Sequence, residues 1–318
     1  MKRDRYSFMW LLILLLVPLV AGLAPVRAEA QTSGRPVLGG HDFTETVGVP
    51  SPFVRTFIRN RLGAGKALDI APSLGEINGQ PITGLKGDLI FAILDFEYQY
   101  AIKSWIGARV RVLGAGRLGS NTGSLLTQGV TMTTGFEFGW LVRLHESRRT
   151  ALSMDLGLTD RGFTSVNLVR FIEDIIEGNQ ASLTRKTPSA RASIGARFAW
   201  SASPLMGVLA NVQTGYGESV ERSKDDVWFF KLGTVLDFDL RTQMSAPLGV
   251  AVGFSYDTFP ELGGDIAQGV NSFFFRFSYL GRSDFLFSVD LSYDRIPLTE
   301  GRETLKGNSI TINMRYYI

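Results

Sequence analysis

The sequence predicts an all-β chain whose strands close into an antiparallel, up-and-down transmembrane barrel with its apolar face turned outward. Three observations carry this prediction. Apolar and polar residues alternate with a period of two over most of the chain, the bulky side chains gather on one of the two resulting faces, and short and long connections alternate between the segments. We expect about twelve strands, with ten to fourteen as the range.

The segment from Val130 to His145 shows the alternation clearly. Its even positions carry mostly bulky apolar residues, and its odd positions are mostly Thr, Gly, Glu, Arg and His. Successive side chains of a strand point to opposite faces, so this segment has one apolar and one polar face. The pattern recurs from Ile90 to Ile318, and no apolar face carries a charge.

The residues opposite the apolar faces distinguish a membrane barrel from a soluble β-sandwich, which alternates as well. They are small or polar, as in the run Gly249, Ala251, Gly253 and Ser255. Bulky residues outside and small ones inside suit a closed barrel in lipid. Aromatic residues near the strand ends predict two interfacial belts, with Tyr98, Tyr100, Trp140, Trp200, Tyr279 and Tyr316 at one end and Trp228, Tyr256 and Tyr293 at the other.

Connection lengths predict the topology. Short connections face the periplasm in such barrels and long ones face outward. The predicted short ones are Ala101–Ser104, Glu146–Thr150, Ser201–Pro204, Arg241–Ala246 and Gly281–Ser283. The predicted long ones are Leu118–Gly129, Thr159–Ser189, Glu218–Asp225, Thr258–Gly269 and Arg295–Gly307. An even strand number requires one more ascending strand, which we place at Lys66–Ala71 with Leu68 and Ile70 facing lipid.

The first thirty residues have the three parts of an export signal. Basic residues precede an apolar run from Phe8 to Ala24, and Ala28 and Ala30 follow at the spacing that signal peptidase accepts. A permanent membrane helix is the alternative, although the run is marginal in length for one. The predicted organisation is a signal peptide at 1–30 with cleavage near Ala30, a periplasmic or luminal segment at 31–62, and a barrel at 63–318.

The charge balance gives no support to nucleic-acid binding. The chain has 33 Lys and Arg against 30 Asp and Glu, a net charge of +3, but four of these bases and two of the acids lie in the first thirty residues. That leaves 29 against 28, or +1. The chain has no cysteine and two histidines, and neither a metal-ligand cluster nor a phosphate-binding glycine loop stands out. We therefore expect no metal, no cofactor and no nucleic-acid partner.

Over residues 63–318 the chain resembles Gram-negative outer-membrane β-barrel proteins. The last nine residues, Ile310–Ile318, keep the alternating apolar positions and an aromatic residue third from the end, but they end in Ile318 rather than phenylalanine. The resemblance implies localisation in the outer membrane of a Gram-negative bacterium. It also implies lipid as the surroundings, and periplasmic chaperones and the barrel-insertion machinery as partners of the C-terminal strand.

Two segments outside the predicted strands have helical spacing. Ser51–Gly63 begins with a capping serine and a proline and ends at a glycine, with Arg55 and Arg59 off its apolar stripe. It predicts either a gate in the lumen, formed by Arg55, Phe57, Ile58 and Arg59, or an interfacial anchor. Val166–Glu177 predicts a helix in the longest outer loop, which either constricts the barrel or packs on its rim.

Charged residues at inward positions suggest what the lumen does. They are Asp95, Glu97, Arg109, Arg111, Glu137, Asp155, Arg197, Lys231, Arg276 and Asp290. With a turn centred on Lys103, Asp95 pairs with Arg111 and Glu97 with Arg109, while Arg276 lies near Ser288 and diagonal to Asp290. Such charges either select small polar solutes in a porin-like channel or fill and rigidify a barrel whose loops serve as receptor, adhesin or scaffold.

A membrane-embedded lipid hydrolase is a third possibility. His145 and Ser147 stand at i and i+2, which would let an imidazole take the proton of a hydroxyl on one face of a strand. The alternation places both at an inward-facing periplasmic turn, away from lipid. No acid is well placed to orient the imidazole, so we expect no enzyme activity and no catalytic residues.

Overall fold

The computed structural model describes residues 34–46, 48–70, 73–77, 80–83, 87–119, 130–166, 175–176, 178, 182, 184–219, 226–259, 269–299 and 303–318. The export signal lies outside these residues, as does most of the helix expected at 166–177. Within the described ranges, no helix is long and apolar enough to cross a membrane.

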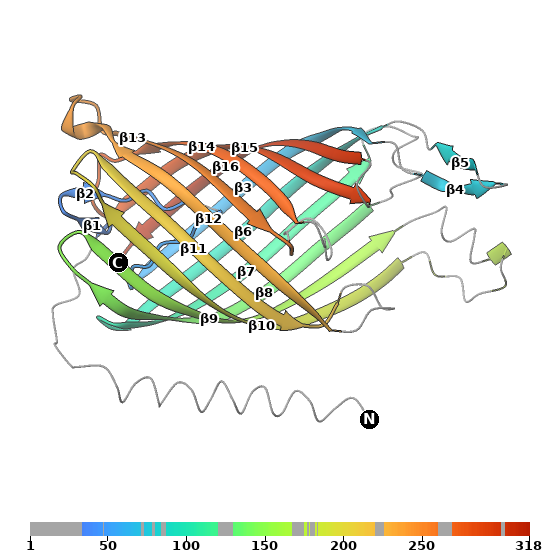
Figure 1. Ribbon diagram of the computed structural model, residues 1–318, viewed down its shortest axis with the longest axis horizontal. Helices are drawn as coiled ribbons and strands as arrows, with labels where there is room; N and C mark the ends of the chain where they lie inside the picture. The colour runs from blue at the N-terminus through green and yellow to red at the C-terminus, as the bar shows by residue number, and fades with distance from the viewer. Residues whose placement is uncertain are drawn as a thin grey trace, which may run out of the picture.

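Twelve antiparallel strands close into one barrel, as the alternation predicted (Figure 1). Each strand pairs with its chain neighbours, and β16 pairs with β3 to close the ring. The strands are β3 (Phe57–Ile70), β6 (Gly87–Lys103), β7 (Ile106–Gly119), β8 (Val130–Glu146), β9 (Thr150–Val166), β10 (Thr184–Ser201), β11 (Met206–Gly217), β12 (Val227–Asp239), β13 (Leu248–Asp257), β14 (Val270–Tyr279), β15 (Phe285–Thr299) and β16 (Glu303–Tyr317).

The helix expected at Ser51–Gly63 is wrong, because β3 begins at Phe57 and not at Lys66. Strand β3 pairs with β16 from Tyr317↔Phe57 onward and with β6 from Phe57↔Gln99 onward. Pairing on both sides satisfies the backbone groups of β3, as a barrel in hydrocarbon requires. The outward residues of β3 include Asn60 and Lys66, so its alternation of polarity is too weak to identify it by pattern alone.

The short connections lie together at the end of the barrel that also holds the C-terminus (Figure 1). At the other end the strands run further than expected. Strand β9 continues to Val166 and β10 begins at Thr184, so the predicted loop Thr159–Ser189 is partly strand, and 300–302 alone separate β15 from β16. Strands of 17 or 18 residues exceed the 9–11 that cross a bilayer, so part of this wall extends beyond the hydrocarbon.

The outer surface of the barrel is mainly apolar, and its charged side chains lie mainly on the inner face. Outward residues such as Phe136 and Leu94 are exposed, while inward Asp95, Arg61 and Arg276 are buried. Among the nine aromatic residues expected in the belts, Trp140, Tyr256 and Tyr293 are half-buried and the other six are exposed. This arrangement matches the inside-out packing of a barrel surrounded by lipid.

Residues 34–56, here called the luminal segment, enter the barrel at the short-turn end. They contain the two short strands β1 (Val37–Leu38) and β2 (His41–Asp42), which pair with each other. Outside the ring, β4 (Ser73–Ile77) pairs with β5 (Gln80–Thr83) at the opposite end, and the 3-10 helix η1 (Leu240–Thr242) follows β12. Most of the luminal segment is buried, although it is not part of the barrel sheet.

Candidate functional site

The luminal segment occupies the lumen from the short-turn end towards the middle. Side chains of the wall donate hydrogen bonds to its backbone, so no strand pairing with the barrel is needed to hold it. The donors and the carbonyl oxygens that accept from them are Arg197 Nη1 to Ser51 at 3.2 Å, Ser153 Oγ to Pro52 at 2.5 Å, Gln99 Nε2 to Phe53 at 3.0 Å and Gln99 Nε2 to Arg55 at 2.9 Å.

One carboxylate on the wall holds the centre of the segment. The N–H of Thr44 donates to Asp237 Oδ2 at 2.5 Å, and the Thr44 hydroxyl donates to Oδ1 at 2.9 Å. His41 Nε2 lies 3.8 Å from the same Oδ2, and His41 Nδ1 donates to the Pro204 carbonyl at 3.2 Å. Thr44 and Asp237 are fully buried, so their polar groups depend on each other in place of water.

A second anchor joins the segment to the last strands of the barrel. Glu45 forms a buried ion pair with Arg315 on β16, and Arg276 on β14 donates to the carbonyl oxygens of Thr44 and Glu45. The guanidinium of Arg276 also binds Asp290 through two nitrogens. These groups therefore form one network from β14 and β15 through the segment to β16.

The segment also packs against an apolar site on the inner wall, here called its seat. Phe43, Val49 and Phe53 form one buried cluster with small and aliphatic residues of the wall, including Ala199 and Leu209. Gly233 makes room for Val49, because a Cβ at position 233 would lie 2.5 Å from Val49 Cγ2. Small inward residues, which the sequence pattern placed in the lumen, are therefore complementary in shape to the segment.

At the entrance to the lumen, charged groups outside the spanning strands are arranged around Asp42. Arg35 Nη2 and Arg241 Nη2 each lie 2.8 Å from Asp42 Oδ2. Burial raises the pKa of Asp42, and the two guanidinium groups oppose that shift. Burial lowers the pKa of Arg35, whereas the side-chain hydrogen bonds that Arg241 donates to the Asp239 carboxylate raise the pKa of Arg241. The N-terminal part of the segment is thus tied to the turn after β12.

An ion-pair network runs along the inner wall over the neighbouring strands β3, β6 and β7. Asp95 accepts from Arg111 through Nε and Nη2, both at 2.9 Å, and its Oδ2 lies 3.0 Å from Arg61 and 3.2 Å from Arg59. Because Asp95 is fully buried among three guanidinium groups, its removal would leave buried positive charge without its counter-ion.

The network continues around the wall through Arg109. This residue contacts Glu137 at 2.5 Å and Asp155 at 3.3 Å, and Asp155 also binds Arg197 at 2.5 Å. Arg197 reaches the backbone of Ser51, so the network and the luminal segment share this residue.

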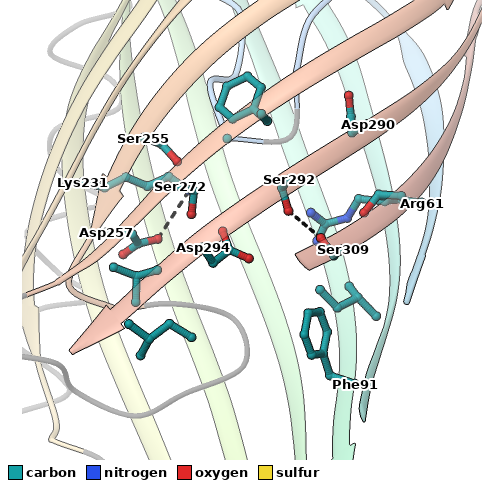
Figure 2. Close-up of a pocket in the computed structure, with 16 residues that line it drawn as sticks. Arg61, Phe91, Lys231, Ser255, Asp257, Ser272, Asp290, Ser292, Asp294 and Ser309 are labelled. Carbon is teal, nitrogen blue, oxygen red and sulfur yellow. Dashed lines mark hydrogen bonds and ion pairs between the residues drawn. The ribbon is translucent and has the colours of Figure 1, made fainter. Parts of the chain in front are cut away.

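Two small cavities lie beside the network. One, of about 70 Å³, is lined by Pro50 and by many of the network charges. The other, of about 170 Å³, is shown in Figure 2, where Ser255, Ser272, Ser292 and Ser309 face the space between Lys231 and Arg61. Both cavities have Lys231 and Asp257 in their lining, and these two side chains form an ion pair at 3.6 Å. These two cavities thus border charged and hydroxyl groups, and the larger one also borders apolar side chains such as Phe91 and Phe274.

The aromatic ring of Phe259 lies inside the barrel against arginines of β9 and β10. Phe259 follows β13 and is buried, with the guanidinium carbon of Arg191 at 3.6 Å and that of Arg161 at 4.2 Å from its ring centroid. Arg161 Nη1 also donates to the Phe259 carbonyl at 3.0 Å. The chain leaving β13 is therefore fastened across the lumen towards β9 and β10.

The structure places all ten candidate lumen residues on the inner face, but the expected register is off by two positions. Glu97, not Asp95, is opposite Arg111, because the turn is only Ser104–Trp105 and a bulge follows Ala101. Asp95 still reaches Arg111 diagonally, while Glu97 binds Arg59 at 2.5 Å.

The same error of two positions occurs at β14 and β15. Arg276 is directly opposite Asp290, and Ser288 is opposite Ser278. The turn at Leu280–Asp284 is longer than the expected Gly281–Ser283, which shifts the pairing. The alternation determines the face on which a residue lies, whereas the turn determines its partner.

The residues of the expected gate are divided between two structures. Arg55 belongs to the luminal segment, whereas Phe57 and Arg59 face inward from β3 and Ile58 faces outward beside Tyr98 and Tyr316. The sequence pattern did not predict Thr44, Glu45, Asp237 and Arg315 as anchors. Asp237 and Arg315 do stand at inward positions of alternating strands, but Thr44 and Glu45 lie in a segment without periodicity.

The pair His145 and Ser147 does not form the expected arrangement. A bulge in β8 puts His145 opposite the outward Leu152 instead of on the inner face. Ser147 Oγ accepts from the N–H of Thr150 at 3.1 Å and lies 2.7 Å from the Thr150 hydroxyl, as in a turn. Within the described residues, no hydrogen bond joins His145 to Ser147, and no three His, Asp or Glu side chains could hold a metal ion.

No protein-family model matches the chain, and no curated protein matches it. Solved structures match its fold. An outer-membrane channel from Pseudomonas putida F1 has 11% identity and a TM-score of 0.50, covering 87% of this chain and 100% of that one. The chain has the fold of an outer-membrane β-barrel.

Two further structures have lower scores. The NanC porin has 9% identity and a TM-score of 0.47, covering 83% of this chain and 100% of its own. The translocator domain of the autotransporter NalP from Neisseria meningitidis has 10% identity and a TM-score of 0.46, covering 85% and 90%. At such identities the likeness concerns the fold alone, so function has to be argued from the lumen.

Proposed function

We propose that this barrel is a gated, porin-like channel for small polar solutes, and that the luminal segment is its gate. The observation that carries the proposal is the way in which the segment is held. The barrel sheet is complete without it, because the twelve strands pair only with one another and β1 pairs with β2. The segment can therefore leave the lumen without breaking a barrel hydrogen-bond ladder.

The chemistry of the lumen supports passage of polar rather than apolar solutes. In the cavities beside the ion-pair network, apolar side chains such as Phe91 and Phe259 are accompanied by hydroxyl, carboxylate and guanidinium groups. Such groups can replace the water that a polar solute loses on entering a narrow pore. Departure of the segment would add the lumen-facing groups of Asp237, Arg276 and Arg197 to this lining.

The rival function is a permanently closed barrel that acts through its outer parts as a receptor, an adhesin or a scaffold. Buried anchors such as the Glu45–Arg315 ion pair and the seat of Val49 favour a segment that stays in place. The two functions differ in one property, which is whether the segment is ever released. A lipid hydrolase receives little support, because His145 and Ser147 are not hydrogen-bonded to each other and Ser147 serves a turn.

Assembly in the outer membrane is part of the proposal. Export would require cleavage near Ala30, which leaves the luminal segment close to the new N-terminus. The C-terminal strand β16 would be recognised by periplasmic chaperones and the insertion machinery before it pairs with β3 and closes the barrel. Membrane fractionation and N-terminal sequencing of the mature protein test this part.

Conductance in planar bilayers tests the channel function. The full mature chain should show a low basal current with brief openings, and deletion of residues 34–55 should give a steady open pore. The deletion stops before Thr56, because the Thr56 carbonyl accepts from the N–H of Ile318 at 3.0 Å and its hydroxyl accepts from the N–H of Ala101 at 3.1 Å. If both proteins insert and neither conducts, the channel proposal is wrong. If both conduct equally, the segment is not the gate.

A further inference from the structure

The outer surface of the barrel carries basic residues at one place near its long-connection end. Arg295 on β15 and Lys306 on β16 are direct cross-strand partners, and both are exposed. Lys66 on β3 lies one outward position nearer the middle of the barrel, opposite Asn308, and its side chain is 52% exposed. Three cationic groups on three adjacent strands therefore share one patch of the exterior.

Two of these charges oppose each other without a counter-ion. Directly opposed like charges destabilise an antiparallel pair, because their Cβ atoms lie only about 4.5–5.5 Å apart. Lys66 binds Asp88 at 2.6 Å, but Arg295 and Lys306 have no ion-pair partner within the part of the chain that the structure describes. An anionic group from outside the chain would remove the repulsion.

The level of this patch relative to the membrane follows from its neighbours. Tyr293, one of the belt residues, is the next outward residue of β15 and lies opposite Asn308. Belt tyrosines lie at the level of the lipid headgroups. Arg295 and Lys306 are one outward position beyond this belt, towards the long-connection end, so they lie at or just beyond the headgroups of the leaflet on that side.

An apolar groove begins directly below the basic patch. It has a volume of about 610 Å³, and its floor is formed by outward-facing small residues, Ala64, Ala92, Gly114 and Gly116. Ile310 and Ile312 border it on β16, and Met132 borders it on β8. Ala64 is opposite Ile310, and Lys66 is two residues further along the same strand. The groove and the basic patch are therefore continuous, with about 7 Å between successive outward positions.

We propose that this face binds a phosphorylated lipid of the outer leaflet, with a phosphate on Arg295, Lys306 and Lys66 and an acyl chain in the groove. Charge complementarity selects an anionic lipid over a neutral one, and the groove selects an acyl chain over a free phosphate. The inference rests on the proposed orientation in the outer membrane, in which the long connections face outward. It does not depend on whether the lumen conducts.

Binding of lipid A to the purified full chain in a neutral detergent tests the site, with native mass spectrometry as the readout. The variant Arg295→Gln/Lys306→Gln should bind lipid A about 30-fold more weakly, since each base near an anionic lipid surface contributes about 1 kcal/mol. Arg282→Gln is the matched control, because this arginine is exposed at the other end and should leave binding unchanged. Inorganic phosphate and dephosphorylated lipid A should each bind much more weakly than intact lipid A.

A second variant tests the groove. Gly114→Leu/Gly116→Leu fills it, and a Cβ at either position meets only one backbone oxygen, at 3.9 or 4.0 Å, so assembly should be retained. It should reduce lipid A binding with the basic patch intact. Undiminished lipid A binding by the double glutamine variant would overturn the proposal. So would a change from dimer to monomer in the groove variant, which would identify a second copy of the chain as the occupant. If either of these two results is accompanied by normal conductance, the lipid-binding proposal is wrong and the channel proposal is unaffected.

Discussion

Thr44 and Asp237 are joined by two hydrogen bonds, from the Thr44 N–H at 2.5 Å and from its hydroxyl at 2.9 Å, to the two oxygens of one buried carboxylate. This pair links the middle of the luminal segment to β12. Hydrogen bonds to a charged acceptor each contribute about 1.5–3 kcal/mol, and they are lost together if the segment moves. The pair therefore acts as a latch between gate and wall.

Asp237→Ala should loosen the segment without opening the sheet. The loss of two hydrogen bonds of about 1.5–3 kcal/mol each should raise the released population roughly a hundred-fold or more. Hydrogen exchange of the peptide containing Thr44 should accelerate accordingly. Asp257→Ala is the control, because that carboxylate binds Lys231 and the N–H of Phe259. Equal exchange rates in the two variants would contradict the latch.

Gly233→Ala should displace the segment by steric conflict. The new Cβ would lie 2.5 Å from Val49 Cγ2, and overpacking of this kind destabilises by about 1–3 kcal/mol. Basal conductance should rise. Adding Val49→Ala removes the nearest conflicting atom and leaves the side-chain oxygen of Asn211 at 2.9 Å, so it should lower the conductance again, whereas Gly114→Ala on the lipid face should have no effect. A double variant as leaky as Gly233→Ala alone would show that Val49 does not occupy this seat when the protein is in the membrane.

Asp95→Asn should affect both stability and selectivity. It leaves Arg59, Arg61 and Arg111 without the carboxylate that they share, and breaking a buried pair destabilises by about 3–5 kcal/mol. In the 34–55 deletion, the reversal potential under a salt gradient should shift towards anions. The matched change Asp284→Asn, at an exposed turn at the short-connection end, should shift neither quantity. An unchanged reversal potential would mean that these charges do not line the conducting path.

Phe136→Arg and Glu137→Gln test which face of β8 meets lipid. Phe136 is 48% exposed on the outer surface, where an arginine at mid-bilayer destabilises by about 2–4 kcal/mol. Phe136→Arg should therefore abolish heat-modifiable, folded barrel in the outer membrane. Glu137→Gln keeps the inward side-chain shape beside Arg109 and should assemble normally. Similar assembly of both variants would invalidate the assignment of faces.

The sequence pattern predicted the barrel for a physical reason. Lipid outside and water inside impose a period of two on every spanning strand, so outward Phe136 and inward Glu137 can be assigned without coordinates. Register is a weaker property of the pattern, because a bulge after Ala101 and the turn at Leu280–Asp284 each shifted the partners by two residues. The assignment of faces survived because a shift of two preserves the face.

The position of the luminal segment inside the barrel could not be predicted from the alternation of apolar and polar residues. Residues such as Thr44 and Ser51 are held by contacts with Asp237 and Arg197, which lie far away along the chain and have no sequence period in common with them. The helical spacing at Ser51–Gly63 was misleading, because Phe57 and Arg59 belong to β3. This strand closes the barrel by pairing with β16 and β6. In this segment, the hydrogen-bonded pairing between strands determined the structure, and the helical spacing of the apolar residues did not.

The most direct test of the gate is a reversible crosslink between segment and wall. A Cβ at Gly48 would lie 3.4 Å from the Cβ of Ser255, close to the separation in a disulfide, and the chain has no cysteine of its own. Single-channel currents of Gly48→Cys/Ser255→Cys should be measured before and after addition of a reductant, with each single variant as control. We expect no openings while the disulfide is intact and recovery of openings on reduction. Openings of equal size and frequency with the crosslink intact would contradict it.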